Sequence, residues 1–186
     1  MPEPESPDEL LVMAAILGNL EAFEQLVVRY RPAVVRLARS IAGADHAEDI
    51  AQDSLLLAFK ALPSIDEPRK FAAWLSAITR HRALRFSKSE TAQVSKRVAL
   101  DEALLEKIEA LAKPPAEKAL ADKERDESMI KAIDSLPPDY AMPLRLRFLD
   151  EMPLNRIAAF MGVPLSTVKW RIHHAKKLLR TKLEST

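Results

Sequence analysis

Apolar side chains recur every three or four residues along most of this chain, and no other feature limits its fold so strongly. Between residues 19 and 41 the series is Phe23, Leu26, Val27, Tyr30, Val34, Leu37, Ala38 and Ile41. This spacing places the apolar side chains on one face of an α-helix. The 186 residues include only three glycines, and the helix-favouring residues Ala, Leu, Glu, Lys and Arg are abundant. The sequence therefore predicts an all-α protein.

Four helices are expected in the first part of the chain, over residues 8–17, 19–41, 46–62 and 69–87. Asn19 is placed to cap the second of them. Pro32 lies inside that helix, where a proline removes one backbone hydrogen bond. A loop is expected at residues 63–68, which begin and end with proline. Because the apolar stripes of the four helices can bury one another, we expect residues 1–88 to form one small helical domain.

Residues 89–128 have a different composition, with ten acidic residues, seven basic residues and the pair Pro114–Pro115. Since a double proline prevents one continuous helix, we expect this segment to be a linker that is flexible or partly helical. Helical spacing then resumes. Residues 129–186 are expected to form a second small domain of four short helices, the first two over 129–136 and 139–148.

The last two expected helices have the pattern of a helix-turn-helix. Gly162 allows a sharp turn between them, and Ser166 is placed to cap the second one. At 100° per residue, the inward side of this second helix is formed by Val168, Ile172, Ala175 and Leu179. The outer face and its flanks carry the residues expected to contact DNA: Ser166, Thr167, Lys169, Trp170, Arg171, His173, His174, Lys176, Lys177 and Arg180. A helix with such a face suits the major groove.

Charge is unevenly distributed along the chain. The formal net charge is +1, yet residues 69–88 carry six basic residues and no acidic one, and residues 154–186 carry seven basic residues and one acidic one. Two separate basic stretches predict two contacts with a polyanion, although solvated helix faces would explain them too. The chain has no cysteine, and no apolar stretch is long enough to span a membrane. We therefore expect a cytoplasmic protein.

The sequence argues against an enzyme. His46 and His81 lie on separate helices, and His173 and His174 point about 100° apart, which is a poor geometry for sharing a metal. Neither a nucleophile with its base nor a phosphate-binding glycine loop is evident. We expect no cofactor and no metal.

Segments in both parts of the chain carry a family resemblance. GNLEAFEQLVVRY, AEDIAQDSLLLAFKAL and FAAWLSAITRHRAL are similar to region 2 of extracytoplasmic-function (ECF) RNA polymerase sigma factors. Residues 132–180, which begin AIDSLPPDYAMPLRLRF and end RIHHAKKLLR, are similar to region 4 of the same family. The resemblance implies a subunit that binds core RNA polymerase and directs promoter-specific transcription initiation. It also implies an anti-sigma factor as a further partner.

The resemblance assigns roles to individual residues as well. It implies that the recognition helix described above reads the −35 element. The −10 element would be contacted by Ser64, Ile65, Asp66, Arg69, Lys70, Arg80, His81 and Arg85. The clamp helices of the largest polymerase subunit would be bound by Asp49, Gln52, Asp53 and Leu56. Trp74 could also stack on a base, but its place on an apolar stripe favours packing in the core.

Two other functions fit parts of the sequence. A sigma-like decoy would bind an anti-sigma factor without recognising a promoter, and it would not need the basic face of the last helix. A repressor would normally dimerise on a two-fold operator, and no self-complementary heptad seam is evident. The intact basic face favours the sigma factor over the decoy, and the missing seam argues against the repressor.

Overall fold

The computed structural model of the chain describes residues 6–97 and 129–184, and all regular structure in these ranges is helical. The expected linker lies outside the described residues from position 98 onward. Within the described ranges, no helix has the length and apolar character needed to cross a membrane.

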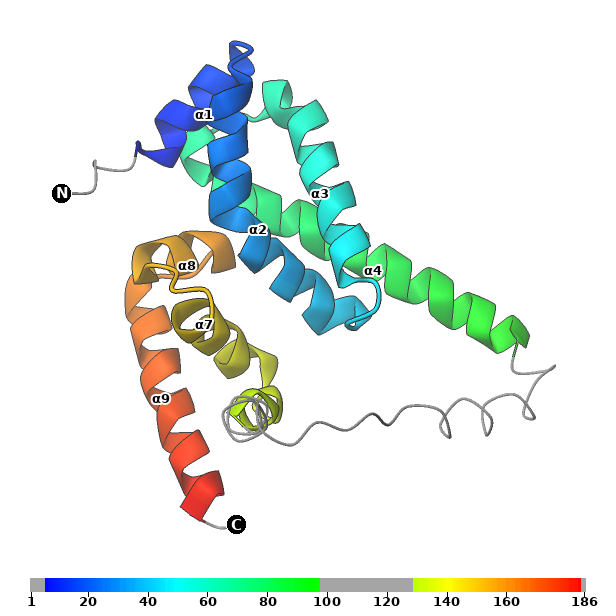
Figure 1. Cartoon of the computed structure of the whole chain (residues 1–186), viewed down its shortest axis with the longest axis vertical. Helices are drawn as coiled ribbons and strands as arrows, with labels where there is room; N and C mark the ends of the chain where they lie inside the picture. The colour runs from blue at the N-terminus through cyan, green and yellow to red at the C-terminus, as the bar shows by residue number, and fades with distance from the viewer. Residues whose placement is uncertain (1–5, 98–128, 185–186) are drawn as a thin grey trace, which may run out of the picture.

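Four helices form the first part of the structure: α1 (Asp8–Ile16), α2 (Leu20–Ala42), α3 (Ala47–Ala61) and α4 (Phe71–Arg97). The predicted cap of α2 is confirmed, because the Asn19 side chain accepts a hydrogen bond of 3.1 Å from the backbone N–H of Ala22. Pro32 lies inside α2, and the helix continues past it. Helix α4 extends to Arg97, so its last turns lie in the segment that the sequence assigned to the linker (Figure 1).

The expected loop between α3 and α4 is partly ordered as two short 3₁₀ helices, η1 (Leu62–Ser64) and η2 (Pro68–Lys70). A proline occupies the first or second position of each. Proline suits these positions because its fixed backbone angle matches the first turn of a helix and its missing N–H has no partner to lose there. The connection therefore consists of two tight turns, and both of them pack against α1.

The second part begins with helical residues 129–134 and continues with α7 (Pro138–Phe148), α8 (Leu154–Met161) and α9 (Leu165–Glu184). Gly162 ends α8 in the left-handed conformation with φ of 66°, which glycine adopts without strain. The predicted cap at Ser166 is wrong. Helix α9 already begins at Leu165, and the carbonyl of Pro164 accepts hydrogen bonds from the N–H groups of Thr167 and Val168.

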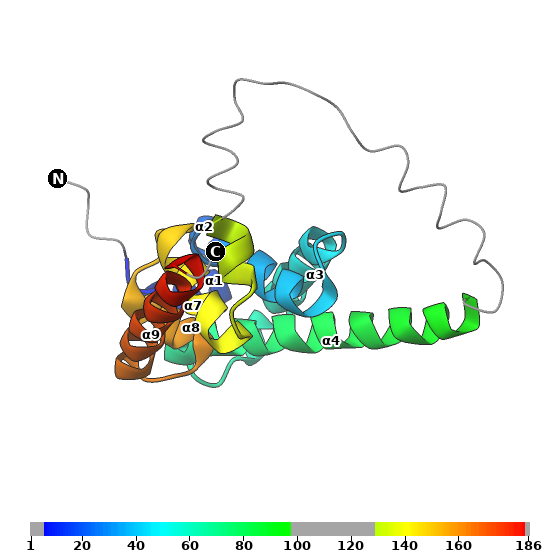
Figure 2. The same ribbon diagram turned by 90° about the horizontal axis from the view of Figure 1, so that it is seen from below.

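Both parts of the chain contribute to one hydrophobic core, which the sequence did not predict. Tyr30 of α2 is fully buried at its centre. Its ring centroid lies 5.8 Å from that of Phe71 in α4 and 6.2 Å from that of Phe160 in α8. Helix α8 therefore packs against α4, and α7 packs against α2 (Figures 1 and 2).

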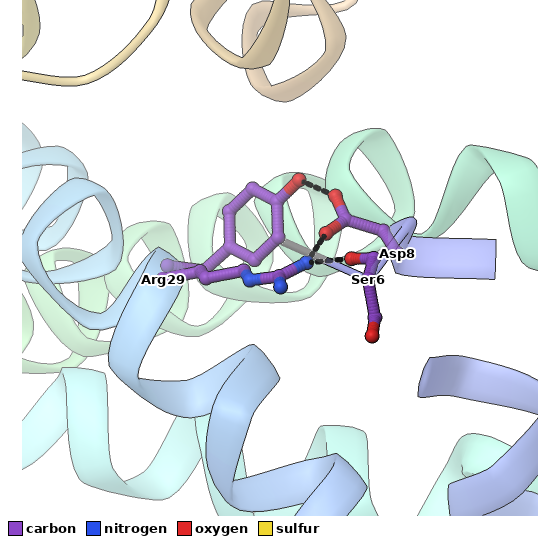
Figure 3. Close-up of polar contacts among 4 residues, drawn as sticks. Ser6, Asp8 and Arg29 are labelled. Atoms are coloured by element: carbon purple, nitrogen blue, oxygen red, sulfur yellow. Dashed lines mark hydrogen bonds and ion pairs between the residues drawn. The ribbon is translucent and has the colours of Figure 1, made fainter. Parts of the chain in front are cut away.

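Polar groups at the edge of this core hold the N-terminal residues in place (Figure 3). The hydroxyl of Tyr30 donates to Asp8. The guanidinium of Arg29 donates to the same carboxylate at 2.7 Å and to the carbonyl of Ser6 at 2.6 Å. Burial, followed by the hydrogen bond to Asp8, raises the pKa of Tyr30 well above its ordinary value. The phenol consequently remains neutral and keeps its role as a donor.

An ion pair joins the two parts of the chain away from the aromatic core. Arg36 of α2 binds Asp150, which follows α7, with one nitrogen–oxygen distance of 2.8 Å. The side chains are only 23% and 11% exposed, respectively. Arg145 lies nearby and pairs with Asp134. Burial, together with the neighbouring Arg36 and Arg39, lowers the pKa of Arg145. Asp150 thus offsets positive charge at a crowded contact between the two parts.

We predict that Asp150→Asn destabilises the protein by about 1–3 kcal/mol, because Arg36 would keep its partly buried charge and lose its carboxylate partner. The free energy of unfolding, measured in urea, tests this. Glu48→Gln is the matched control, since it breaks the pair of Glu48 with Arg31, whose side chains are 62% and 56% exposed. That change should cost less than about 1 kcal/mol. Equal effects of the two substitutions would contradict the role given to Asp150.

Candidate nucleic-acid interface

Helix α9 has the orientation that its sequence pattern predicts. Val168, Ile172 and Ala175 are buried, and Leu179 is partly buried and packs against the same core. These side chains face α7 and α8, against which α9 packs (Figure 1). The opposite side of the helix is therefore turned toward solvent.

The outer face of α9 is not covered by the described part of the chain. Trp170 is 55% exposed. The other exposed members of the predicted set are Ser166, Lys169, His173, Lys176, Lys177 and Arg180, while Thr167, Arg171 and His174 are half-buried. A surface that joins basic groups to aromatic rings can contact both phosphates and base edges.

Two of the predicted cations are held by neighbouring side chains. A nitrogen of Arg171 lies 3.6 Å from the carboxylate of Asp139 in α7, and the Arg171 side chain is only 19% exposed. The ammonium of Lys176 lies 4.6 Å from the centre of the Phe148 ring. Lys169 and Lys177, which are exposed, leave more of their side chain available for a phosphate than Arg171 does.

Sequence reasoning missed Tyr140, which lies in the first turn of α7. Its ring centroid is 6.0 Å from that of Trp170 and 5.2 Å from that of His174. Trp170 and His174 are themselves stacked, with centroids 5.2 Å apart and ring planes 9° from parallel. No helical periodicity relates Tyr140 to α9, because the contact depends on how α7 packs against α9.

The residues predicted to contact the −10 element lie on two adjoining elements. Ser64, Asp66, Arg69 and Lys70 are exposed in the turns before α4, and Ile65 is half-buried. Arg80, His81 and Arg85 are exposed on α4.

Two of these side chains already have acidic partners. Arg69 lies 3.2 Å from Glu9, and Lys70 lies 2.6 Å from Glu67. Both pairs are well exposed, so each is weak and can be exchanged for a phosphate.

Trp74 is half-buried, and its ring centroid lies 6.0 Å from that of Phe71, as expected for a side chain packed at the edge of the core.

The residues predicted to bind polymerase share the outer side of α3 but have different surroundings. Gln52 and Leu56 line a groove of about 880 Å³ between α2 and α3, together with Phe23, Val27 and Phe59. Leu56 is 50% exposed. Asp49 and Asp53 are exposed too, and Asp53 pairs with Arg82 of α4. The structure therefore places an open apolar groove beside the acidic residues of α3.

No cluster of three or more acidic, histidine or cysteine side chains that could hold a metal ion occurs within residues 6–97 and 129–184. In these ranges, the surfaces described above consist of basic, aromatic, acidic and apolar side chains suited to binding macromolecules.

Comparisons with known proteins identify the family. Residues 26–93 match the family model described as Sigma-70 region 2, and residues 126–179 match the one described as Sigma-70, region 4. The chain is 31% identical over 170 residues to the ECF RNA polymerase sigma factor SigW of Bacillus subtilis (strain 168), with 89% of this chain and 91% of the relative covered. This chain belongs to the ECF sigma factors.

The structure of the sigma factor is similar to two solved structures. The structure of CnrH in complex with the cytosolic domain of CnrY matches with a TM-score of 0.59 and 23% identity, covering 97% of this chain and 99% of that one. The sigma factor RpoE in complex with the anti-sigma factor NepR from Bartonella quintana matches with a TM-score of 0.50 and 24% identity, covering 87% and 96%. Both matches support the all-α fold.

Membership of the family establishes that the sigma factor directs transcription initiation at promoters. The family is one of non-catalytic transcription factors. The expectation of a sigma factor with regions 2 and 4 is thus confirmed.

Proposed function

We propose that this sigma factor binds promoter DNA at two places and core RNA polymerase at a third. The −35 element is read by the outer face of α9. The observation that carries this assignment is the division of α9 into a buried apolar side and an exposed side with Trp170 and lysines. In the major groove, Ser166, Trp170, His173 and His174 face base edges. The side chains that face phosphates are Thr167, Lys169, Arg171, Lys176, Lys177 and Arg180.

The −10 element is bound by the turns before α4 and by the exposed side of that helix. Ser64, Ile65, Asp66, Arg69 and Lys70 form the part that approaches the bases, and Arg80, His81 and Arg85 follow the backbone. Support comes from the exposure of all these residues except the half-buried Ile65 and from the absence of acidic residues between positions 69 and 88. A basic surface beside groups that can contact bases suits a single strand.

Core polymerase is bound by α3 through Asp49, Gln52, Asp53 and Leu56, with the clamp helices of the largest subunit as the partner. Support comes from the groove between α2 and α3 and from the exposed carboxylates next to it. Apolar contact in the groove would supply affinity, and the carboxylates would orient a basic partner.

The domains are assigned as region 2 over residues 1–88, a linker over 89–128 and region 4 over 129–186. Tethering two DNA-binding domains raises the effective concentration of the second contact once the first has formed.

The protein acts in the cytoplasm, has no enzymatic activity and needs neither a metal nor another cofactor. An anti-sigma factor is a further partner, which the complex of the similar RpoE with NepR supports.

We predict that Leu56→Asp weakens binding to core polymerase roughly tenfold or more, because it removes apolar area that binding would bury and places a charge in the contact. Titration of fluorescently labelled sigma factor with core polymerase measures the affinity. Leu84→Asp is the control, since Leu84 is similarly exposed, at 45%, but lies on α4. Wild-type affinity of the Leu56 variant would remove the assignment of α3.

We predict that Lys177→Gln makes the negative slope of log affinity against log salt shallower by about 1 for holoenzyme on a promoter fragment, because one phosphate contact is lost. Lys60→Gln, in the last turn of α3, makes the same charge change on another domain and should leave the slope unaltered. If the two variants have equal slopes, α9 does not contact phosphates through Lys177.

A further inference from the structure

The first turn of α7 supports the DNA-facing side of α9 through two consecutive residues. Asp139 pairs with Arg171, and Tyr140 contacts the rings of Trp170 and His174. Figure 1 shows α7 and α9 side by side, and their contacts agree with that view. Neither residue belongs to the helix-turn-helix itself, yet together they touch three of the residues assigned to DNA.

Tyr140 has a fixed place from which to act. It is half-buried and packs against the hydrophobic core. Its backbone N–H donates to the carbonyl of Pro137 at 2.9 Å, and Pro138 restricts the start of the helix. The ring of Tyr140 is therefore held by the body of the domain, while Trp170 projects into solvent.

An exposed tryptophan on a helix normally samples several side-chain rotamers, and binding would have to select one of them. Here the Trp170 ring lies parallel to His174 on one side and meets Tyr140 at a tilt of 50°. Aromatic pairs at such distances attract each other. The three rings thus favour one orientation of Trp170 before any DNA is present.

We propose that Tyr140 is a positioning residue that holds the Trp170–His174 stack as a rigid apolar surface for the 5-methyl group of thymine. This inference rests on the proposed binding of α9 in the major groove. Thymine is distinguished there by its methyl group, which favours apolar contacts. Burial of one methyl group changes an affinity about fourfold, so the stack contributes to the choice of promoter sequence.

The experiment uses holoenzyme and the promoter fragment that gives the strongest run-off signal with the wild-type chain. Each thymine of the −35 element is replaced singly by deoxyuridine, which removes only the methyl group. The wild type should bind about fourfold more weakly at one or two positions. Trp170→Ala should bind thymine and deoxyuridine fragments equally at those positions. Tyr140→Leu should lose at least half of the discrimination, and Tyr140→Phe, which keeps the ring, should retain it.

A second measurement reports on the orientation of Trp170 directly. The chain has two tryptophans, so Trp74→Phe leaves Trp170 as the sole indole fluorophore. Time-resolved fluorescence anisotropy should show a larger fast component when Tyr140→Leu is added and an unchanged one when Tyr140→Phe is added. Circular dichroism checks that all variants are folded, and Trp170→Ala tests the methyl contact even if Tyr140→Leu is unstable.

The outcomes separate this inference from the proposed function. The methyl contact is overturned if deoxyuridine does not weaken binding of the wild type, or if discrimination between thymine and deoxyuridine survives Trp170→Ala. Either result counts against the methyl contact even if Lys177→Gln makes the salt slope shallower as proposed. The role of Tyr140 is overturned if Tyr140→Leu changes neither the discrimination between thymine and deoxyuridine nor the fluorescence anisotropy. If Lys177→Gln also leaves binding unaltered and no −35 substitution matters, the assignment of α9 to DNA has itself failed.

Discussion

The burial of Tyr30 is the constraint on which the arrangement of this sigma factor depends. Its ring touches Phe71 and Phe160, and its hydroxyl donates to Asp8. One side chain thereby joins the N-terminal residues, α2, α4 and α8. A buried hydroxyl without a partner would cost about 1–3 kcal/mol, so the position of Asp8 is set by the same packing. Helix α8 in turn supports α9, and the core is linked through this chain of contacts to the surface proposed to bind DNA.

Local patterns in the sequence were sufficient to predict much of the fold. The structure agrees with the predicted extents of α2 and α3 and with the cap at Asn19. It also agrees with the predicted buried side of α9, formed by Val168, Ile172 and Ala175. Each depends on residues within a few turns of one another, where helical spacing alone decides which side chains share a face. The two candidate DNA surfaces follow from the same argument, because a helix that buries one side must expose the other.

Contacts between distant segments could not be predicted in this way. Arg36 and Asp150 are 114 positions apart, and nothing in helical periodicity pairs them. The shared core around Tyr30 and the contact of Tyr140 with α9 likewise depend on tertiary packing. For the same reason, the pattern of α9 placed Arg171 on the flank of the outer face but did not predict its ion pair with Asp139 of α7. The error at Ser166 has a local cause, since the carbonyl of Pro164 already serves as the first acceptor of the helix.

Transcription in vitro is the most direct test of whether this chain directs initiation at promoters. Purified core RNA polymerase is incubated with fragmented genomic DNA, with and without this chain, and the run-off transcripts are sequenced. We predict a set of discrete transcripts that require the chain and whose start sites share two conserved elements upstream. Identical transcripts in both reactions, with core polymerase shown to bind the chain, would contradict it.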